Sequence, residues 1–314
     1  MTCPGHTRRR FLKTSMLGGL AAIAAGRPAS HATAQEAPAA DTGRVALTSG
    51  EDHANIVFEA LRPFGPEVAR AIGDRQVIVK PNNVAIDIPL SATAAECLEG
   101  TLEFLKSIGK LDGALIAESA ANGPTLEGFS NYGYDKVAAK YGAKLVDLDN
   151  EKTEQVFVFD EKDFRPHPVR MSRLLLDRDK FFVISAAKLK THDLVVATLS
   201  LKNIIFGAPV KDVGFRSRTR RETGLISQKP IAHGSGIYGI NYNLFDLAKR
   251  LGPDLALIDG YRGMEGNGPT RGTPVEHRVC VASNDWLAAD RVAVELMSID
   301  FSTVGYLYYC AQAN

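Results

Sequence analysis

Three residues that can carry positive charge follow an apolar run near the middle of this sequence. Lys188, Lys190 and His192 stand at alternating positions after Phe181–Ser185. If the chain stays extended there, the three side chains point to one side, because strand side chains alternate. Cations that emerge beside a buried strand can neutralise a phosphate or a carboxylate. We therefore expect an anion site at this strand end.

Three more polar groups follow predicted strands directly. Asn82 and Asn83 follow 77–80, Glu118 follows 114–117, and the glycine-rich run Asp259–Pro269 follows 255–258. The glycines of that run let the backbone approach a ligand closely and expose amide groups to an anion. In open parallel sheets, ligands sit beyond the carboxyl ends of the strands. All four groups can therefore converge on one crevice.

The converging side chains suggest three roles. Lysines would neutralise the anion, asparagines would orient it by hydrogen bonds, and carboxylates would hold a cation or act as a base. The candidate catalytic residues are Lys190, His192 as proton donor or ligand, and Glu265. The candidate ligand-binding residues are Asn82, Asn83, Glu118, Lys188, Lys202, Asn203, Asp259, Gly266 and Asn267. The sequence names neither a metal nor a cofactor.

Each of these features also has a plain structural interpretation. The lysines can form a charged strand end, the two asparagines an Asx turn, and the glycine-rich run a turn-rich connection. That run matches neither the dinucleotide-binding pattern nor the P-loop pattern. A G-x-S-x-G elbow is absent, and no histidines or cysteines stand at zinc-ligand spacing. The motifs therefore indicate no nucleotide site, no serine triad and no compact zinc site.

Alternating strands and helices must position these groups. Apolar runs predict strands at 76–80, 114–117, 144–147, 181–185, 254–258 and 275–282, and an edge strand or hairpin arm at 156–159. Helical spacing predicts helices at 94–108, 134–141, 243–251 and 285–297. Asp52 and Asp285 can each cap a helix, and Ser91 or Thr93 can cap the helix that begins at Ala94.

The order of these elements predicts the fold class. Strands joined through helices require right-handed crossovers, so we expect an α/β fold with a mostly parallel sheet flanked by helices. The segment 211–236 departs from the alternation, because it holds Arg216, Arg218, Arg220, Arg221 and several glycines. We expect a mobile basic loop there, serving as a lid or as a solvated connection.

The first 34 residues resemble a twin-arginine export signal. Thr7–Lys13 places adjacent arginines before Phe-Leu-Lys, a short apolar stretch follows at 16–25, and Ala32-Thr33-Ala34 offers a cleavage site. The apolar stretch is too short and too rich in glycine to span a bilayer stably. We expect export through the twin-arginine machinery to the periplasm or another extracytoplasmic space, cleavage after about Ala34, and a linker at 35–43.

The composition limits the classes of partner. Residues 1–34 hold five basic residues and no acidic one, so the formal charge changes from +1 to −4 when they are removed. Nothing in that balance calls for nucleic acid or an anionic membrane surface. Cys97 and Cys280 lie in apolar patterns, which favours buried thiols. We expect a small-molecule ligand as the main partner.

Several motifs together resemble the family called domain of unknown function 362. They are Val79-Lys80-Pro81-Asn82, Lys188–His192, Thr198–Asn203, and Asp259-Gly260 with 263–269. The resemblance covers residues 44–314 as one α/β domain, and the family has no settled activity. It implies that the terminal element at Asn314 is incomplete. Many relatives add a ferredoxin-type cysteine segment that this sequence lacks, so an iron–sulfur centre would be expected only on a partner.

These observations favour an exported protein that binds a small anionic ligand or cofactor at the carboxyl edge of the sheet. They leave open whether it is an enzyme. The alternative is a non-catalytic binding protein or redox-partner module of an envelope complex.

Overall fold

The computed structural model describes residues 43–216 and 224–313. The expected export signal, nearly all of the expected linker, and Arg218, Arg220 and Arg221 lie outside the described residues. None of the helices within these two ranges is long and apolar enough to cross a membrane.

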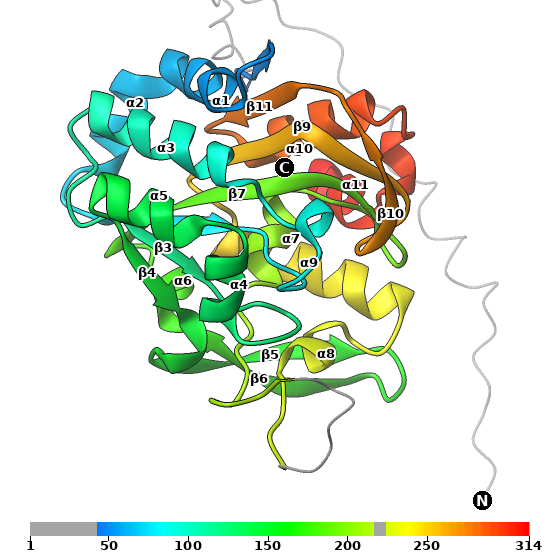
Figure 1. The fold of residues 1–314 in the computed structure, drawn as a ribbon. Coiled ribbons are helices and arrows are strands. Elements are labelled where there is room, and N and C mark those ends of the chain that lie inside the picture. Colours follow the sequence, from blue (N-terminus) through cyan, green and yellow to red (C-terminus); the bar gives the residue numbers. More distant parts are fainter. Residues whose placement is uncertain (1–42, 217–223, 314) are drawn as a thin grey trace, which may run out of the picture. The chain divides into compact units, whose positions relative to one another are not determined.

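A nine-stranded sheet runs through the described residues (Figure 1). Its main path has the order β1-β11-β9-β7-β2-β3-β4, with β8 paired to β7 and β10 paired to β9. The strands are β1 (Ala46–Ser49), β2 (Gln76–Pro81), β3 (Leu115–Glu118), β4 (Lys144–Asp147), β7 (Phe181–His192), β8 (Val196–Thr198), β9 (Leu255–Asn267), β10 (Arg271–Val275) and β11 (Val279–Ser283). Neighbours from β9 through β7, β2 and β3 to β4 are parallel, whereas β11 and β1 add antiparallel. The predicted α/β fold with a mostly parallel sheet is confirmed.

Helices cover both faces of this sheet (Figure 1). Helices α1, α2, α3 and α5 bury one apolar cluster, and α7, α9, α10 and α11 bury the other. The helices are α1 (His53–Leu61), α2 (Gly65–Ile72), α3 (Ala95–Ser107), α4 (Thr125–Asn131), α5 (Tyr134–Tyr141), α6 (Arg173–Leu176), α7 (Ser200–Ile205), α8 (Lys229–Ala232), α9 (Ile237–Leu251), α10 (Trp286–Leu296) and α11 (Gly305–Ala313). Alternation puts Val77 and Val79 on the first face and Ile78 on the second, which explains the continuous apolar runs.

A separate hairpin accounts for the segment that the sequence left open as an edge strand or hairpin arm. Strands β5 (Thr153–Asp160) and β6 (Arg165–Ser172) pair antiparallel and form their own two-stranded sheet. The hairpin lies below the central sheet in Figure 1, beside α8.

Two strands are longer than predicted, because pairing partners far along the chain extend them. β7 does not end at Ser185 but continues to His192, since β9 and β8 pair with its last residues. β9 does not end at Ile258 but continues to Asn267, where the chain turns back into β10. The glycine-rich run is therefore mostly a β-hairpin rather than a loop.

Other boundaries also differ from the prediction. The single strand expected at 275–282 is divided, because Arg278 takes a positive φ of 51° between β10 and β11. Helix α9 begins at Ile237 rather than at 243. Within the predicted basic loop, Arg216 is exposed, but Lys211 and Lys229 are buried.

Two of the three predicted helix caps are confirmed, and the third is wrong. Asp52 and Asp285 accept amide hydrogens at the starts of α1 and α10, as expected. Neither Ser91 nor Thr93 caps α3. The hydroxyl of Thr93 instead donates to the carbonyl of Ala186 on β7, and this contact ties the segment before α3 to the central sheet.

Candidate functional site

The carboxyl ends of β2 and β3 meet in a buried network that contains several of the predicted site residues. Lys80 Nζ lies 2.8 Å from Glu118 Oε2 and donates to Asn203 Oδ1 at 3.0 Å. Asn82 Nδ2 donates to the same oxygen at 3.1 Å, and the amide of Asn83 donates to Glu118 Oε2 at 2.9 Å. Burial lowers the pKa of Lys80, and the Glu118 carboxylate opposes that shift. The two charges therefore form a compensated pair.

A second compensated pair joins β7 to β9. Lys188 Nζ lies 3.1 Å from Asp259 Oδ2, and His53 Nε2 lies 2.9 Å from Asp259 Oδ1. The ring of His53 stacks on Tyr261 with 4.3 Å between centroids. Asp259 Oδ2 also accepts the amide of Ala94 at 3.3 Å, just before α3. Burial raises the pKa of Asp259, but the charge of Lys188 and the hydrogen bond with His53 together lower it by more. The net shift is downward, so the group stays a carboxylate.

Two lysines beside these pairs have no carboxylate partner in the ranges that the structure describes. Lys190 is fully buried, and its Nζ donates to the carbonyl of Ser91 at 2.6 Å. Lys202 is 7% exposed; its Nζ lies 5.2 Å from the ring centroid of Phe206 and has no hydrogen-bond acceptor among the described residues. The site therefore holds more basic than acidic side chains.

Burial and neighbouring cations lower the pKa of both amines. The pKa of Lys190 lies well below its usual value, because of burial first and then the charges of Lys202 and Lys188. Burial lowers the pKa of Lys202 to about 7, with Lys80 acting in the same direction and Asp193 opposing it. Such shifts accompany both functional sites and structural ion networks.

His192 lies beside this pair as a neutral ring. It is 9% exposed, and burial followed by the charge of Lys202 lowers its pKa. Its Nδ1 accepts the amide of Leu194 at 3.1 Å, so we infer that Nε2 carries the proton. Asp193 Oδ1 also lies 3.0 Å from Nδ1, but that side chain is 67% exposed and cannot offset the burial of the ring among lysines.

Two buried asparagines carry polar atoms that lack partners within the described ranges. These atoms are Asn82 Oδ1 and both side-chain polar atoms of Asn83. Buried polar groups are normally hydrogen-bonded, so orphaned atoms indicate a place for water or a ligand. The absence of a side chain at Gly128 lets the backbone of α4 lie close to Asn83, since a Cβ there would lie 2.6 Å from Asn83 Nδ2.

Helix α7, which carries Lys202 and Asn203, is fixed at both ends. Asp290 accepts the amides of the first two residues of the helix at 2.8 and 3.1 Å, and burial raises the pKa of this carboxyl to about 7. Gly207 follows the helix, and a Cβ at this position would lie 1.8 Å from Lys80 Cε. Only glycine therefore allows α7 to approach Lys80 this closely.

The β9–β10 hairpin reaches the edge of the site without adding side chains to it. Thr191 Oγ1 donates to Gly266 O at 2.9 Å, so the hairpin lies beside the end of β7. Glu265, Gly266 and Asn267 are nevertheless exposed. No hydrogen bond or ion pair between described residues joins the side chain of Glu265 or Asn267 to the buried lysines.

Sequence reasoning missed three further buried lysines. Lys80 enters the sequence analysis only within a family motif, although a charged residue at the end of an apolar strand is itself a signal of a buried ion pair. Lys211 pairs with Asp149 at 3.1 Å, and Lys229 donates to the carbonyl of Pro209 at 2.9 Å. Nothing local marks these two, because they stand in a segment whose composition is that of a polar loop.

The described residues contain no group of three or more histidine, cysteine, aspartate or glutamate side chains placed to hold a metal ion. Glu118 and Asp259, which were expected to hold a cation or act as a base, are each paired with a lysine instead. Cys97 and Cys280 are buried, as predicted, and burial raises the pKa of both thiols.

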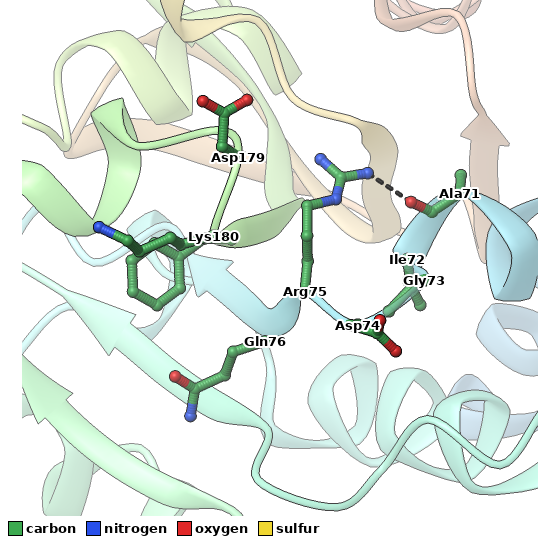
Figure 2. A pocket seen from close by; sticks show the side chains of 9 residues that line it. Ala71, Ile72, Gly73, Asp74, Arg75, Gln76, Asp179 and Lys180 are labelled. Carbon is green, nitrogen blue, oxygen red and sulfur yellow. Dashed lines mark hydrogen bonds between the residues drawn. The ribbon is translucent and has the colours of Figure 1, made fainter.

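A visible hollow lies at the opposite, amino ends of β2 and β7 (Figure 2). It has a volume of ≈ 670 Å³ and is lined by residues 71–76 and 179–181. The guanidinium of Arg75 donates there to the carbonyl of Ala71, and it also contacts Asp254. The hollow contains none of the predicted site residues.

Comparisons with known proteins point to a family. The model of the domain of unknown function (DUF362) matches residues 77–295. The thylakoid-associated protein sll1697 of Synechocystis sp. (strain ATCC 27184 / PCC 6803 / Kazusa) is 26% identical over 234 residues. That match covers 74% of this chain and 65% of the relative, so the chain spans less than two thirds of the relative's length.

Proposed function

Since this chain belongs to the domain of unknown function family DUF362, whose description assigns no activity, we propose from the geometry that it binds a small anionic ligand. The ligand lies at the carboxyl edge of the central sheet, between Lys190 and Lys202. The observation that supports this most is that Lys202 is buried, with 7% of the residue exposed, and that its amine lacks an acceptor among the described residues.

The charge balance of the site explains why an anion fits. Lys80 and Lys188 are matched by Glu118 and Asp259, whereas Lys190 and Lys202 are unmatched in the described chain. A buried ammonium without a counter-charge costs several kcal/mol, and proteins relieve this by deprotonation or by a bound anion. A ligand with one or two negative charges would favour the protonated form of Lys190 and Lys202 and would balance their positive charge.

Hydrogen-bonding groups nearby narrow the class of anion. The orphaned Asn82 Oδ1 is an acceptor, so it would take a hydroxyl group or a protonated oxygen of the ligand. A singly protonated phosphate or a small hydroxy carboxylate has this combination of groups. An inorganic halide lacks it.

Calorimetric titration of the mature chain tests the proposal, with inorganic phosphate and L-lactate as probes and sodium chloride at matched ionic strength as the blank. We expect Lys202→Met and Lys190→Met each to weaken binding by about 10- to 100-fold, since a charged hydrogen bond contributes about 1.5–3 kcal/mol. Lys180→Met is the matched control, because Lys180 is exposed and paired with Asp177 at the amino edge. Unchanged affinity in both site variants, or no binding of either probe, would overturn the proposal.

We also propose that residues 1–34 act as a twin-arginine leader that delivers the domain outside the cytoplasm. The support is the pattern Arg8-Arg9 followed by Phe11-Leu12-Lys13. Replacing Arg8 and Arg9 with lysine keeps the charge but removes the pattern. Cell fractionation should then find the chain unprocessed and retained, and continued export would contradict the proposal.

A further inference from the structure

The site contains six buried lysines, and one of them is different. Lys80, Lys188 and Lys211 pair with carboxylates, while Lys190 and Lys229 donate to backbone carbonyls. The amine of Lys202 has neither kind of partner within the described residues, and only the Phe206 ring lies against it. No described group donates a hydrogen bond to this amine or holds its N–H groups in one direction, so its lone pair can turn toward a ligand whenever the amine is unprotonated.

We propose that Lys202 forms an imine with an anionic ligand that carries an aldehyde or ketone, such as a 2-oxo acid. This rests on the proposed function, because it names the ligand class of the same site. Lys190 pairs with the carboxylate of the ligand, and Lys202 meets the adjacent carbonyl carbon.

The surroundings of Lys202 favour its nucleophilic form. Basic groups approach it from β2 through Lys80 and from β7 through Lys190 and His192, and Asp193 is the acidic group that opposes them. Burial and, to a smaller extent, the charge of Lys80 lower the pKa of Lys202 to about 7 against the charge of Asp193, so much of the amine is neutral near neutral pH. A desolvated lysine beside another cationic group is a recognised way to activate an amine.

The chemistry balances without an oxidant or reductant. The neutral amine attacks the carbonyl carbon, so one C–N bond forms and one amine proton moves to the oxygen, which gives a carbinolamine. The carbinolamine then loses its hydroxyl group and the second amine proton as water. A C=N bond to Lys202 remains, and no atom has been oxidised or reduced.

The same residues explain selectivity for a carbonyl acid over a neutral aldehyde. An acid brings the negative charge that the two unmatched lysines lack, whereas a neutral aldehyde does not. The site therefore concentrates the carbonyl next to the one buried amine without a described acceptor.

The test is reductive trapping on the mature chain, with pyruvate as the probe and sodium cyanoborohydride as the trapping reagent. Intact mass should show one reduced adduct, and peptide mapping should place it on Lys202. L-lactate should compete with the labelling, because it has the same charge and no carbonyl. Mapping on the wild-type chain does not depend on any variant folding.

Two variants sharpen the result. Lys202→Arg keeps the charge but should remove the adduct, whereas Lys180→Arg should keep it. Labelling should rise as the pH passes upward through about 7, while phosphate affinity falls over the same range, since one needs the neutral amine and the other the ammonium. Labelling spread over exposed lysines, or labelling that persists in Lys202→Arg, would overturn the imine.

Failure of the imine can be distinguished from failure of anion binding. If phosphate and lactate bind in a Lys202-dependent way but pyruvate leaves no adduct, the imine is wrong and the anion site stands. If neither anion binds and no adduct forms, both proposals fail.

Discussion

The two edges of the central sheet treat charge in opposite ways. At the amino edge, Arg75 and Arg178 both contact Asp254, and the three side chains are 20–23% exposed. At the carboxyl edge, Lys190 and Lys202 are buried without a carboxylate partner in the described ranges. The same parallel strands thus end in ion-paired, partly exposed charges on one side and in buried charges without a described carboxylate partner on the other.

This difference shows that a surface cavity need not coincide with the residues best suited to bind a ligand. The amino edge has the hollow of Figure 2, but the two basic side chains that line it, Arg75 and Lys180, already have carboxylate partners. The carboxyl edge holds the amine of Lys202 and side-chain atoms of Asn82 and Asn83 that lack hydrogen-bond partners in the described chain. A ligand gains more from unmatched groups than from empty space, so we place function at the carboxyl edge.

Breaking one ion pair at each edge should give the largest contrast. Glu118→Gln leaves Lys80 buried without its carboxylate, and we expect about 4 kcal/mol of lost unfolding free energy. Asp254→Asn breaks a wetter pair and should cost about 1 kcal/mol. Denaturant unfolding of both variants measures this contrast. Equal losses would mean that the two edges do not differ in solvation.

Removing an unmatched buried amine should raise the free energy of unfolding, whereas breaking an ion pair lowers it. Lys190→Met replaces a buried amine with an apolar chain of similar length, and we expect the ligand-free protein to gain about 1–2 kcal/mol, even though the Ser91 carbonyl loses its donor. Lys180→Met at the exposed amino edge should change stability by less than about 0.5 kcal/mol. Denaturant unfolding of both variants measures these changes. A large loss of unfolding free energy in Lys190→Met would show that this amine stabilises the fold.

The sequence was sufficient for the parts that depend on local pattern. The strands at 76–80 and 144–147 are apolar or alternating runs between turn signals, and the structure has them within a residue or two. Their parallel order followed from the helices between them. Because the carboxyl ends of parallel strands share one edge, the meeting of Lys188 with Asp259, and of Asn83 with Glu118, was accessible from the sequence.

The rest depends on contacts between distant segments. The glycine-rich run after Ile258 looks like a loop until β10 and the end of β7 are placed beside it. Lys229 reads as a loop charge, although it is buried against the carbonyl of Pro209. His53 acquires its role only because α1 packs against Asp259. Local composition carries none of this information.

The unmatched lysines should also make stability depend on pH. Lys202 has a pKa of about 7 when folded against 10.5 in its ordinary form, so between these values the unfolded chain holds a proton that the folded chain lacks. Unfolding free energy should therefore rise with pH over this range, by about 1.4 kcal/mol per unit for this group.

Urea unfolding between pH 7 and pH 9.5 measures that slope. Lys202→Met should reduce it by up to about 1.4 kcal/mol per pH unit, and the amino-edge variant Lys180→Met should leave it unchanged. Saturating phosphate should flatten the wild-type slope, because a bound anion favours the protonated lysine. A slope that is identical in wild type and Lys202→Met would show that this amine titrates normally.

The smallest effect is expected at the rim of the carboxyl edge. Glu265 was a candidate catalytic residue, but it is exposed on the β9–β10 hairpin, and no described hydrogen bond or ion pair joins it to the lysines. An exposed carboxylate is screened by water and salt, so Glu265→Gln should change phosphate affinity by less than about twofold and stability by less than about 0.5 kcal/mol. Titration calorimetry at two salt concentrations checks both the affinity and the screening. If Glu265→Gln instead weakens phosphate or pyruvate binding about tenfold, the hairpin must close over the buried lysines when ligand binds, and the boundary of the site would move outward to include it.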